Sequence, residues 1–194
     1  MSEDCLFVSG KGNMDIRIKK TKNSIINAFL ELRTKKEIER ITVKELCEKA
    51  MINKSTFYSH YTDIYDLSEY LENQTANEIV TSLEHPENII IKPKEFNSEL
   101  FYAYLSQESL IQTLFSGSRS NQLLYKIEKS LKEIIFEMRP EYKDNTVVNV
   151  IFTYAIYGGF YAFEKCRRFG DKEVIDVLAD LNEKVIELLE WVFP

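Results

Sequence analysis

The chain has 194 residues, of which 44% are hydrophobic and 29% charged, with only 6 glycines and 4 prolines. This apolar content is enough for a buried core, which excludes a largely disordered chain, and the scarcity of turn residues disfavours an all-β fold. The three scattered cysteines form neither a disulfide framework nor a metal knuckle, as expected for a cytoplasmic protein. No basic segment followed by a long apolar run is found near the N-terminus, so no signal peptide is expected.

The net charge of −6 is distributed unevenly along the sequence. Residues 1–62 contain 12 Lys and Arg against 8 Asp and Glu, a net charge of +4. Residues 63–194 contain 13 Lys and Arg against 23 Asp and Glu, a net charge of −10. The overall acidity argues against a generic nucleic-acid binder, whereas the asymmetry indicates a basic head on an acidic body, with chance variation as the alternative.

Apolar residues recur at three- and four-residue spacing from residue 16 onward, which predicts helices. Residues 1–14 lack this period and are expected to form a flexible extension. His85-Pro86 ends one periodic stretch and opens an expected loop that reaches Lys94. No strand pattern competes, so the expected fold class is all-α. Nine helices are predicted, over residues 17–34, 42–50, 53–61, 63–83, 96–106, 108–116, 119–138, 145–168 and 171–191.

Two short helices joined by a three-residue turn are predicted between Thr42 and Tyr61. Thr42 and Glu45 have the spacing of a capping box at the start of the first helix, and Asn53 is a good N-cap for the second. A helix as short as the second is not stable alone, so it must pack against its neighbours. This is the outline of a helix-turn-helix unit, whose second helix enters the major groove of DNA.

The exposed edge of the second helix offers side chains that can donate to phosphates or to base edges. Thr42 lies at a helix N-terminus, where free backbone amides attract a phosphate. Plainer interpretations exist: Thr42 and Asn53 are needed as caps, Lys54 alone is an ordinary surface lysine, and Phe57 and Tyr61 suit a core better than a DNA contact. The predicted DNA-binding residues are Thr42, Lys44, Lys54, Ser55, Thr56, Tyr58, Ser59 and His60.

Residues 17–67 also carry a set of motifs that occur together in one family. They comprise the I-x-x-A-F-x-x-L pattern of Ile25, Ala28, Phe29 and Leu32, then Ile41-Thr42-Val43 and Leu46, and the run Lys54-Ser55-Thr56-Phe57-Tyr58-Ser59-His60-Tyr61. The last run is highly specific, and with it the chain resembles the tetracycline-repressor-like (TetR/AcrR) transcriptional regulators. The resemblance implies a DNA-binding head, a variable ligand-binding body and a homodimer. By motif position it implies that residues 54–61 form the recognition helix, with DNA contacts at Thr42, Lys54, Thr56, Tyr58 and His60.

Two residues depart from the family pattern. Met51 stands where the family usually has a turn glycine, so the turn is either slightly strained or avoids a positive φ. Ile64 stands where a lysine commonly contacts phosphate, and its absence removes about one ionic contact with DNA.

Residues 145–163 contain no charge and are long enough for a membrane span. Asparagines, threonines, tyrosines and a glycine pair make them a poor hydrocarbon helix, so we expect no membrane span. We expect instead a helix buried on most sides, which touches its own core on one face and a partner chain on another. A stripe of small side chains, spaced by three and four residues, lets another helix approach closely. The resemblance assigns residues 145–168 and 171–191 to a four-helix dimer interface. The predicted interface residues are Ala155, Gly159, Ala162 and Cys166.

The acidic body is rich in aromatic residues, for which the plain interpretation is core filling. Tyrosines on adjacent helices can also line an effector pocket, because such pockets are apolar with a few placed polar groups. The predicted pocket residues are Phe101, Tyr104, Phe115, Phe152, Tyr157 and Phe160. No catalytic motif, metal-ligand spacing or phosphate-binding glycine loop is found, so no enzyme activity, metal or cofactor is expected.

These patterns predict three parts: a flexible extension over residues 1–14, a helix-turn-helix DNA-binding domain over 15–62, and a ligand-binding and dimerisation domain over 63–194. The expected function is a ligand-responsive transcriptional regulator, by family default a repressor, which binds a near-palindromic DNA operator as a homodimer and responds to an unknown small-molecule effector. The alternative is a helical dimeric module that binds a small molecule or a protein and whose head no longer reads DNA. The acidic net charge and Ile64 favour this alternative.

Overall fold

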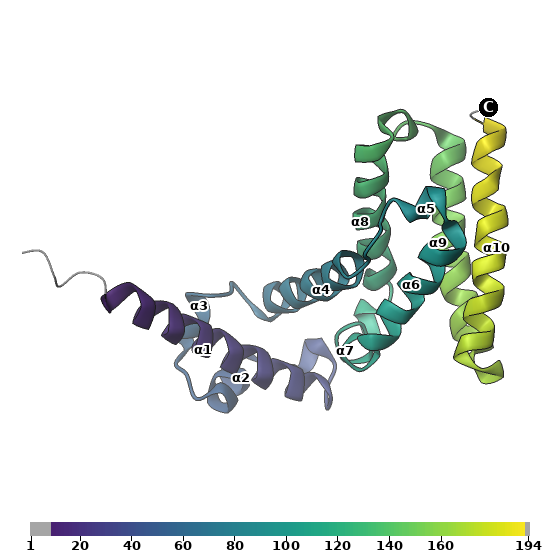
Figure 1. Ribbon diagram of the computed structural model, residues 1–194. Helices are drawn as coiled ribbons and strands as arrows, with labels where there is room; N and C mark the ends of the chain where they lie inside the picture. Colours follow the sequence, from purple (N-terminus) through teal and green to yellow (C-terminus); the bar gives the residue numbers. More distant parts are fainter. Residues whose placement is uncertain (1–8, 193–194) are drawn as a thin grey trace, which may run out of the picture. The chain divides into compact units, whose positions relative to one another are not determined.

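The structure, a computed structural model, describes residues 9–192 (Figure 1). Within this range every regular element is a helix and no strand occurs, so the predicted all-α fold class is confirmed. The α-helices are α1 (Ser9–Arg33), α2 (Val43–Ala50), α3 (Lys54–Tyr58), α4 (Ile64–Thr81), α5 (Asn88–Ile91), α6 (Pro93–Ser106), α7 (Glu108–Leu114), α8 (Gln122–Met138), α9 (Thr146–Cys166) and α10 (Asp171–Val192). Four short 3-10 helices accompany them: η1 (Ile38–Arg40), η2 (Gly117–Arg119), η3 (Pro140–Tyr142) and η4 (Arg167–Phe169).

The largest differences between the observed helices and the sequence predictions lie at three places. Helix α1 begins at Ser9, inside the predicted extension, of which residues 1–8 lie outside the described part of the chain. The expected loop before Lys94 contains the four-residue helix α5, which is anchored by the buried side chain of Ile89. Helix α3 spans only five residues, so it is shorter than predicted.

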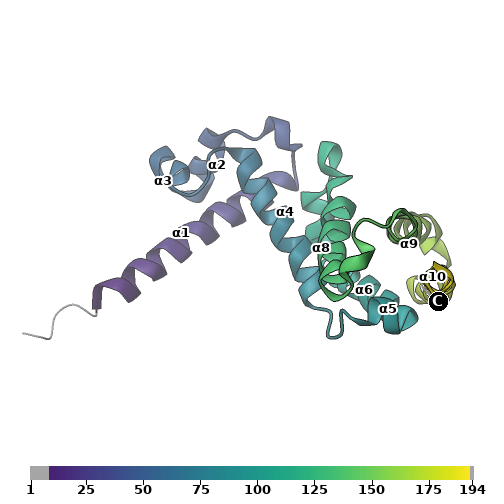
Figure 2. The same cartoon turned by 90° about the horizontal axis from the view of Figure 1, so that it is seen from above.

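The chain divides into two compact units, the first ending at Leu71 and the second beginning at Glu72, within α4. The first unit gathers α1, α2, α3 and the start of α4 (Figure 2). Its core consists of side chains with no exposed surface, contributed by all four helices, so that each short element is held by apolar contact with the others. These side chains are Ile25, Phe29, Leu46, Phe57 and Leu67.

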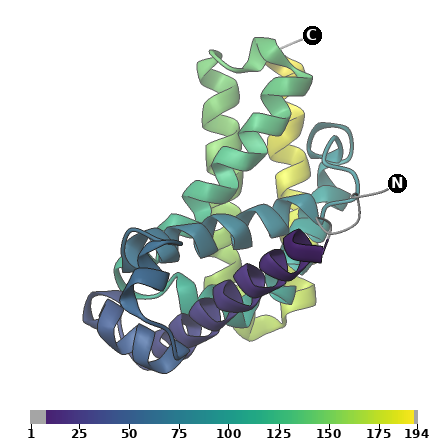
Figure 3. The same cartoon turned by 90° about the vertical axis from the view of Figure 1, so that its left-hand side faces the viewer.

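The second unit is built on the long helices α8, α9 and α10, which stand side by side (Figure 3). Helix α10 packs along both α9 and α6. Apolar residues on the inner faces of these helices and of α7 form the core. Large side chains with almost no exposed surface in this core are Phe152, Phe163, Leu114, Leu131 and Ile135.

One buried carboxylate joins α4 to the segment before α8 in the second unit. Glu72 has no exposed surface, and its two oxygens accept hydrogen bonds from Arg119 Nε at 2.8 Å and Arg119 Nη2 at 2.5 Å. Lys126 Nζ lies 3.9 Å from the same carboxylate. A buried charge is tolerated only when it is paired and hydrogen-bonded, and this bidentate contact meets that condition.

Candidate functional site

The two short helices of the first unit are each started by a side-chain cap, as predicted. Thr42 Oγ1 accepts from the backbone N–H of Glu45 at 3.2 Å, while the Glu45 carboxylate accepts from Lys36 Nζ at 2.5 Å. Asn53 Oδ1 accepts from the backbone N–H of Thr56 at 2.7 Å. It also accepts from the Ser55 hydroxyl at 2.7 Å and the Thr56 hydroxyl at 2.8 Å. One amide oxygen thus fixes the first turn of α3.

The turn between α2 and α3 passes through the left-handed region at Met51, which has φ 54° and ψ 43°. Met51 is the only non-glycine residue with a positive φ in the described part of the chain. The sequence left two possibilities for this turn, a strained backbone or one that avoids a positive φ. The structure shows the first, since Met51 has a positive φ. An L-residue in this conformation costs about 1–2 kcal/mol, and the Met51 side chain is 93% exposed, so no packing offsets the cost.

Helix α3 separates a buried edge from an exposed one. Phe57 is fully buried and Tyr61 nearly so, and burial raises the pKa of Tyr61 to about 12, in agreement with the core interpretation of both. Ile64 is also buried, so this position belongs to the core and carries no surface contact. Thr56 and His60 are partly exposed. The other predicted DNA-binding residues are exposed, namely Thr42, Lys44, Lys54, Ser55, Tyr58 and Ser59.

The exposed polar groups differ in what they can offer to DNA. The hydroxyl protons of Ser55 and Thr56 are directed to Asn53, and that of Ser59 to the backbone carbonyl of Thr56 at 2.7 Å. Phosphate oxygens only accept hydrogen bonds, so these hydroxyls suit them poorly in this arrangement. The side chains of Lys54 and Tyr58 are exposed and can donate to phosphate.

A basic stretch in the middle of α1 belongs to the same unit, although the predicted DNA-binding residues do not include it. Arg17, Lys19 and Lys20 are exposed, and Lys22 Nζ lies 4.0 Å from the centroid of the Tyr70 ring. The sequence feature that could have indicated a DNA contact here is the cluster of positive charges over residues 17–22. The same cluster also fits the ordinary solvent-exposed face of a helix, so it is not specific.

The second unit contains a cavity of about 70 Å³ between α6, α8, α9 and α10. Of the six predicted pocket residues, Phe101, Tyr104, Phe152 and Phe160 line it. Phe115 is buried outside the lining, and Tyr157 is hydrogen-bonded to Glu128, so neither contributes to this cavity. The sequence pattern missed the two asparagines of the lining, Asn97 and Asn182, because buried asparagines have no periodic signal.

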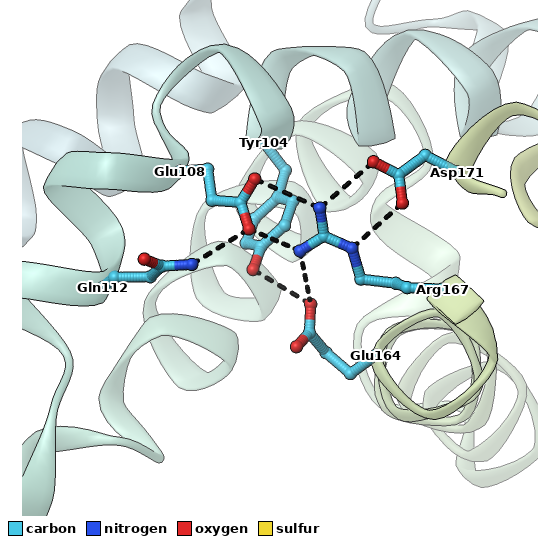
Figure 4. Close-up of polar contacts among 6 residues, drawn as sticks. All are labelled: Tyr104, Glu108, Gln112, Glu164, Arg167 and Asp171. Carbon is cyan, nitrogen blue, oxygen red and sulfur yellow. Dashed lines mark hydrogen bonds and ion pairs between the residues drawn. The ribbon is translucent and has the colours of Figure 1, made fainter.

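A network of charges lies next to the aromatic wall of the cavity (Figure 4). The Arg167 guanidinium forms a bidentate ion pair with Glu108 and a second with Asp171, at 3.0 and 3.1 Å. The Tyr104 hydroxyl donates to Glu164 at 3.2 Å, and Glu164 lies 3.7 Å from Arg167. The hydrogen bonds from Arg167 lower the pKa of both Glu108 and Asp171, whereas burial and the nearby Glu164 raise the pKa of Tyr104.

The stripe of small residues on α9 lies, at Gly159, against helix α10 of the same chain. A Cβ atom at the buried Gly159 would lie 3.2 Å from Asn182 Nδ2 of α10, and Ala155 lines the cavity. Ala162 and Cys166 are half-buried. The close helix approach that this stripe predicts therefore occurs between α9 and α10, and a role of these four residues in a dimer stays a prediction.

An apolar face of α9 and α10 is nevertheless uncovered. The segment Thr146–Phe169 contains 18 consecutive residues with a mean hydropathy of 1.3, which is long and apolar enough to cross a membrane. Only 28% of these 18 residues are buried. In the single chain the helix is thus largely uncovered, and the partner chain expected on its other face stays a prediction. The exposed apolar residues on the two helices are Val147, Val150, Tyr154, Tyr161, Val177, Leu181 and Leu188.

Comparison with known proteins gives one informative match. No family model matches the chain. Over 85 residues the chain is 29% identical to the uncharacterized HTH-type transcriptional regulator YxbF of Bacillus subtilis (strain 168). That relative is a helix-turn-helix regulator. The aligned stretch is 43% of the present chain and 21% of the relative, so the chain spans about a fifth of the relative's length. The similarity supports a helix-turn-helix regulator in general, and membership of the TetR/AcrR family stays a prediction.

The strain at Met51 predicts a stabilising substitution. Met51→Gly removes the Cβ atom that disfavours the left-handed conformation, and this gain exceeds the added backbone entropy of a glycine in the unfolded chain. We expect the free energy of unfolding to rise by about 0.5–1 kcal/mol. Urea denaturation measures this as a higher midpoint at unchanged slope. Met51→Ala, which keeps the Cβ atom, is the matched control, and an equal gain from alanine would contradict the explanation.

The Arg167 network predicts a pH dependence of stability. Because Arg167 lowers the pKa of Glu108 and Asp171 in the folded state, its stabilisation is complete above their ordinary pKa values and is lost as the pH falls through the lowered ones. Arg167→Met should therefore flatten the loss of stability between about pH 5 and pH 3. Urea unfolding at a series of pH values tests this. The neighbouring exposed Arg168→Met serves as control and should leave the slope unchanged.

Proposed function

We propose that the chain is a ligand-responsive DNA-binding transcriptional regulator that acts as a homodimer in the cytoplasm, as a repressor of the TetR/AcrR type. The observation that carries the proposal is the exposed polar edge of α3, fixed by Asn53 and backed by the buried Phe57. The similarity to a helix-turn-helix regulator supports the same assignment. The proposal assigns no enzymatic activity to the chain.

The homodimer is supported by the uncovered face of α9 and α10. Val147, Val150, Tyr154 and Tyr161 recur at three-, four- and seven-residue steps on α9, and Val177, Leu181 and Leu188 follow at steps of four and seven on α10. Exposed apolar patches of this kind mark association surfaces in soluble proteins. A two-fold axis between two copies pairs the same surface with itself and gives the operator its near-palindromic symmetry. The two α3 helices then read half-sites about 34–36 Å apart.

The response to a ligand is supported by the apolar cavity of the second unit. A small molecule changes DNA binding only if it binds the non-binding conformation more tightly than the DNA-binding one. A near-complete switch requires a difference of about 5.5 kcal/mol between the two states.

The competing function is a dimeric binding module without DNA recognition. The buried Ile64 in place of a phosphate-contacting lysine and the net charge of −6 favour it. The two functions differ in one measurable property, which is sequence-preferring binding to a DNA duplex.

DNA binding is tested by selection from a pool of random duplexes, followed by gel-shift titration of the selected sequence at several salt concentrations. Lys54→Ala removes one phosphate contact per subunit, so the dissociation constant should rise roughly tenfold. The slope of log K against log salt should become less negative by about 1.8 for a dimer. Tyr58→Ala should also weaken binding. Lys35→Ala, an exposed lysine outside the two short helices, is the control, and equal binding by all variants would favour the competing module.

Dimerisation is tested by the molecular mass in solution. The double substitution Tyr154→Glu and Leu181→Glu places charges on the uncovered face of α9 and α10, where a partner would desolvate them. We expect a dimer for the unmodified chain and a folded monomer for the variant, measured by light scattering with circular dichroism as the folding check. Glu133→Lys on the exposed side of α8 is the control. A monomeric unmodified chain would overturn the homodimer.

A further inference from the structure

The cavity of the second unit has a wall that is almost entirely apolar. Carbon-rich side chains from α5, α6, α8, α9 and α10 surround it, and no charged side chain lines it. The only amides in the lining are Asn97 of α6 and Asn182 of α10. An ionised ligand would lose its water here without meeting an opposite charge, at a high cost in free energy.

Asn97 carries an unsatisfied hydrogen-bonding group. Its side chain is 92% buried, since only 8% of its surface is exposed, and its Oδ1 atom has no hydrogen-bond partner. An acceptor buried without a partner is unfavourable, and native proteins contain few of them, often at functional sites. Asn182, also 92% buried, lies against Gly159 and closes the neighbouring part of the wall.

The available space is small for an organic ligand. The cavity of about 70 Å³ is about half the roughly 150 Å³ that encloses benzene in an engineered protein core, so a single ring enters it only where wall side chains shift or where part of the ring stays in the open side of the cavity. Polar atoms are few, so a chain of water molecules filling this space would lack partners. The Tyr104 hydroxyl is already directed to Glu164.

We propose that this cavity binds a neutral, predominantly apolar small molecule, no larger than phenol, which carries one hydrogen-bond donor directed to Asn97 Oδ1. The inference rests on the proposed function, in which such a molecule is the effector, and it names the chemical class that the function leaves open. The apolar wall supplies affinity, Asn97 selects a donor, and the absence of a charged side chain from the lining rejects ions.

Three matched probes separate these contributions. Phenol carries a hydroxyl donor, toluene has the same shape without a donor, and benzoate carries a negative charge. Each is titrated into the full-length protein without DNA, and binding is measured by calorimetry. We expect phenol to bind about three- to tenfold more tightly than toluene, as one buried hydrogen bond allows, and benzoate to show no binding. Equal affinity for phenol and toluene, or preference for benzoate, would overturn the proposal.

Two variants test the role of Asn97. In Asn97→Leu the acceptor is replaced by an apolar group of similar size, so the preference for phenol over toluene should disappear while toluene still binds. Asn121→Leu, an asparagine exposed at the start of α8, should keep the preference. If Asn97→Leu is shown by circular dichroism not to fold, the ranking of the three probes on the unmodified protein still decides the question.

A separate measurement distinguishes the cavity from the regulatory function. The gel shift on selected DNA is repeated with and without phenol. Probe binding with the expected ranking supports the ligand class even if DNA binding is absent, in which case the proposed function fails alone. DNA binding without any probe binding overturns the ligand class and leaves the DNA-binding function in place.

Discussion

The short helix α3 depends on contacts from outside its own five residues. A helix of this length forms too few internal hydrogen bonds to offset the cost of its nucleation. Asn53 supplies bonds to its first turn, and Phe57 fixes it in the apolar core of the first unit. The position of the exposed edge of α3 is therefore set by that core and by the Asn53 cap. A surface that has to match the fixed spacing of a DNA groove requires this kind of support.

In the second unit, α9 has two roles that place different demands on one helix. Its inner face, with Phe152, Gly159 and Phe163, packs in the core or against α10. Its outer face is apolar but exposed in the single chain. The composition of α9 therefore resembles that of a membrane helix, while its glycine and asparagine content reflects close packing and capping. The second copy in the proposed homodimer would cover the outer face and so account for its apolar side chains.

The sequence predicted the fold class, most helices and the division of α3 into buried and exposed edges, because these follow from periodicity and capping. Thr42 and Asn53 act as the N-caps that their positions indicate. The left-handed conformation of Met51 was left open, since a methionine carries no local signal for a positive φ. The small-residue stripe correctly indicated a close helix approach, but spacing alone does not say which helix approaches, and within the chain Gly159 meets α10. Asn97 and the exclusion of Tyr157 from the cavity depend on long-range packing, which no short pattern contains.

The hydrogen bonds that converge on Asn53 also bear on which nucleotides this helix can prefer. With their protons held internally, Ser55 and Thr56 present lone pairs to the outside. In the major groove, the exocyclic amino groups of adenine and cytosine are the donors that match such oxygens, whereas the O6 and N7 atoms of guanine are acceptors and do not. A rotation of either hydroxyl toward guanine would break a bond to Asn53 and loosen the first turn of the helix. If α3 enters the major groove as proposed, base preference and helix stability are linked through the side-chain oxygen of Asn53.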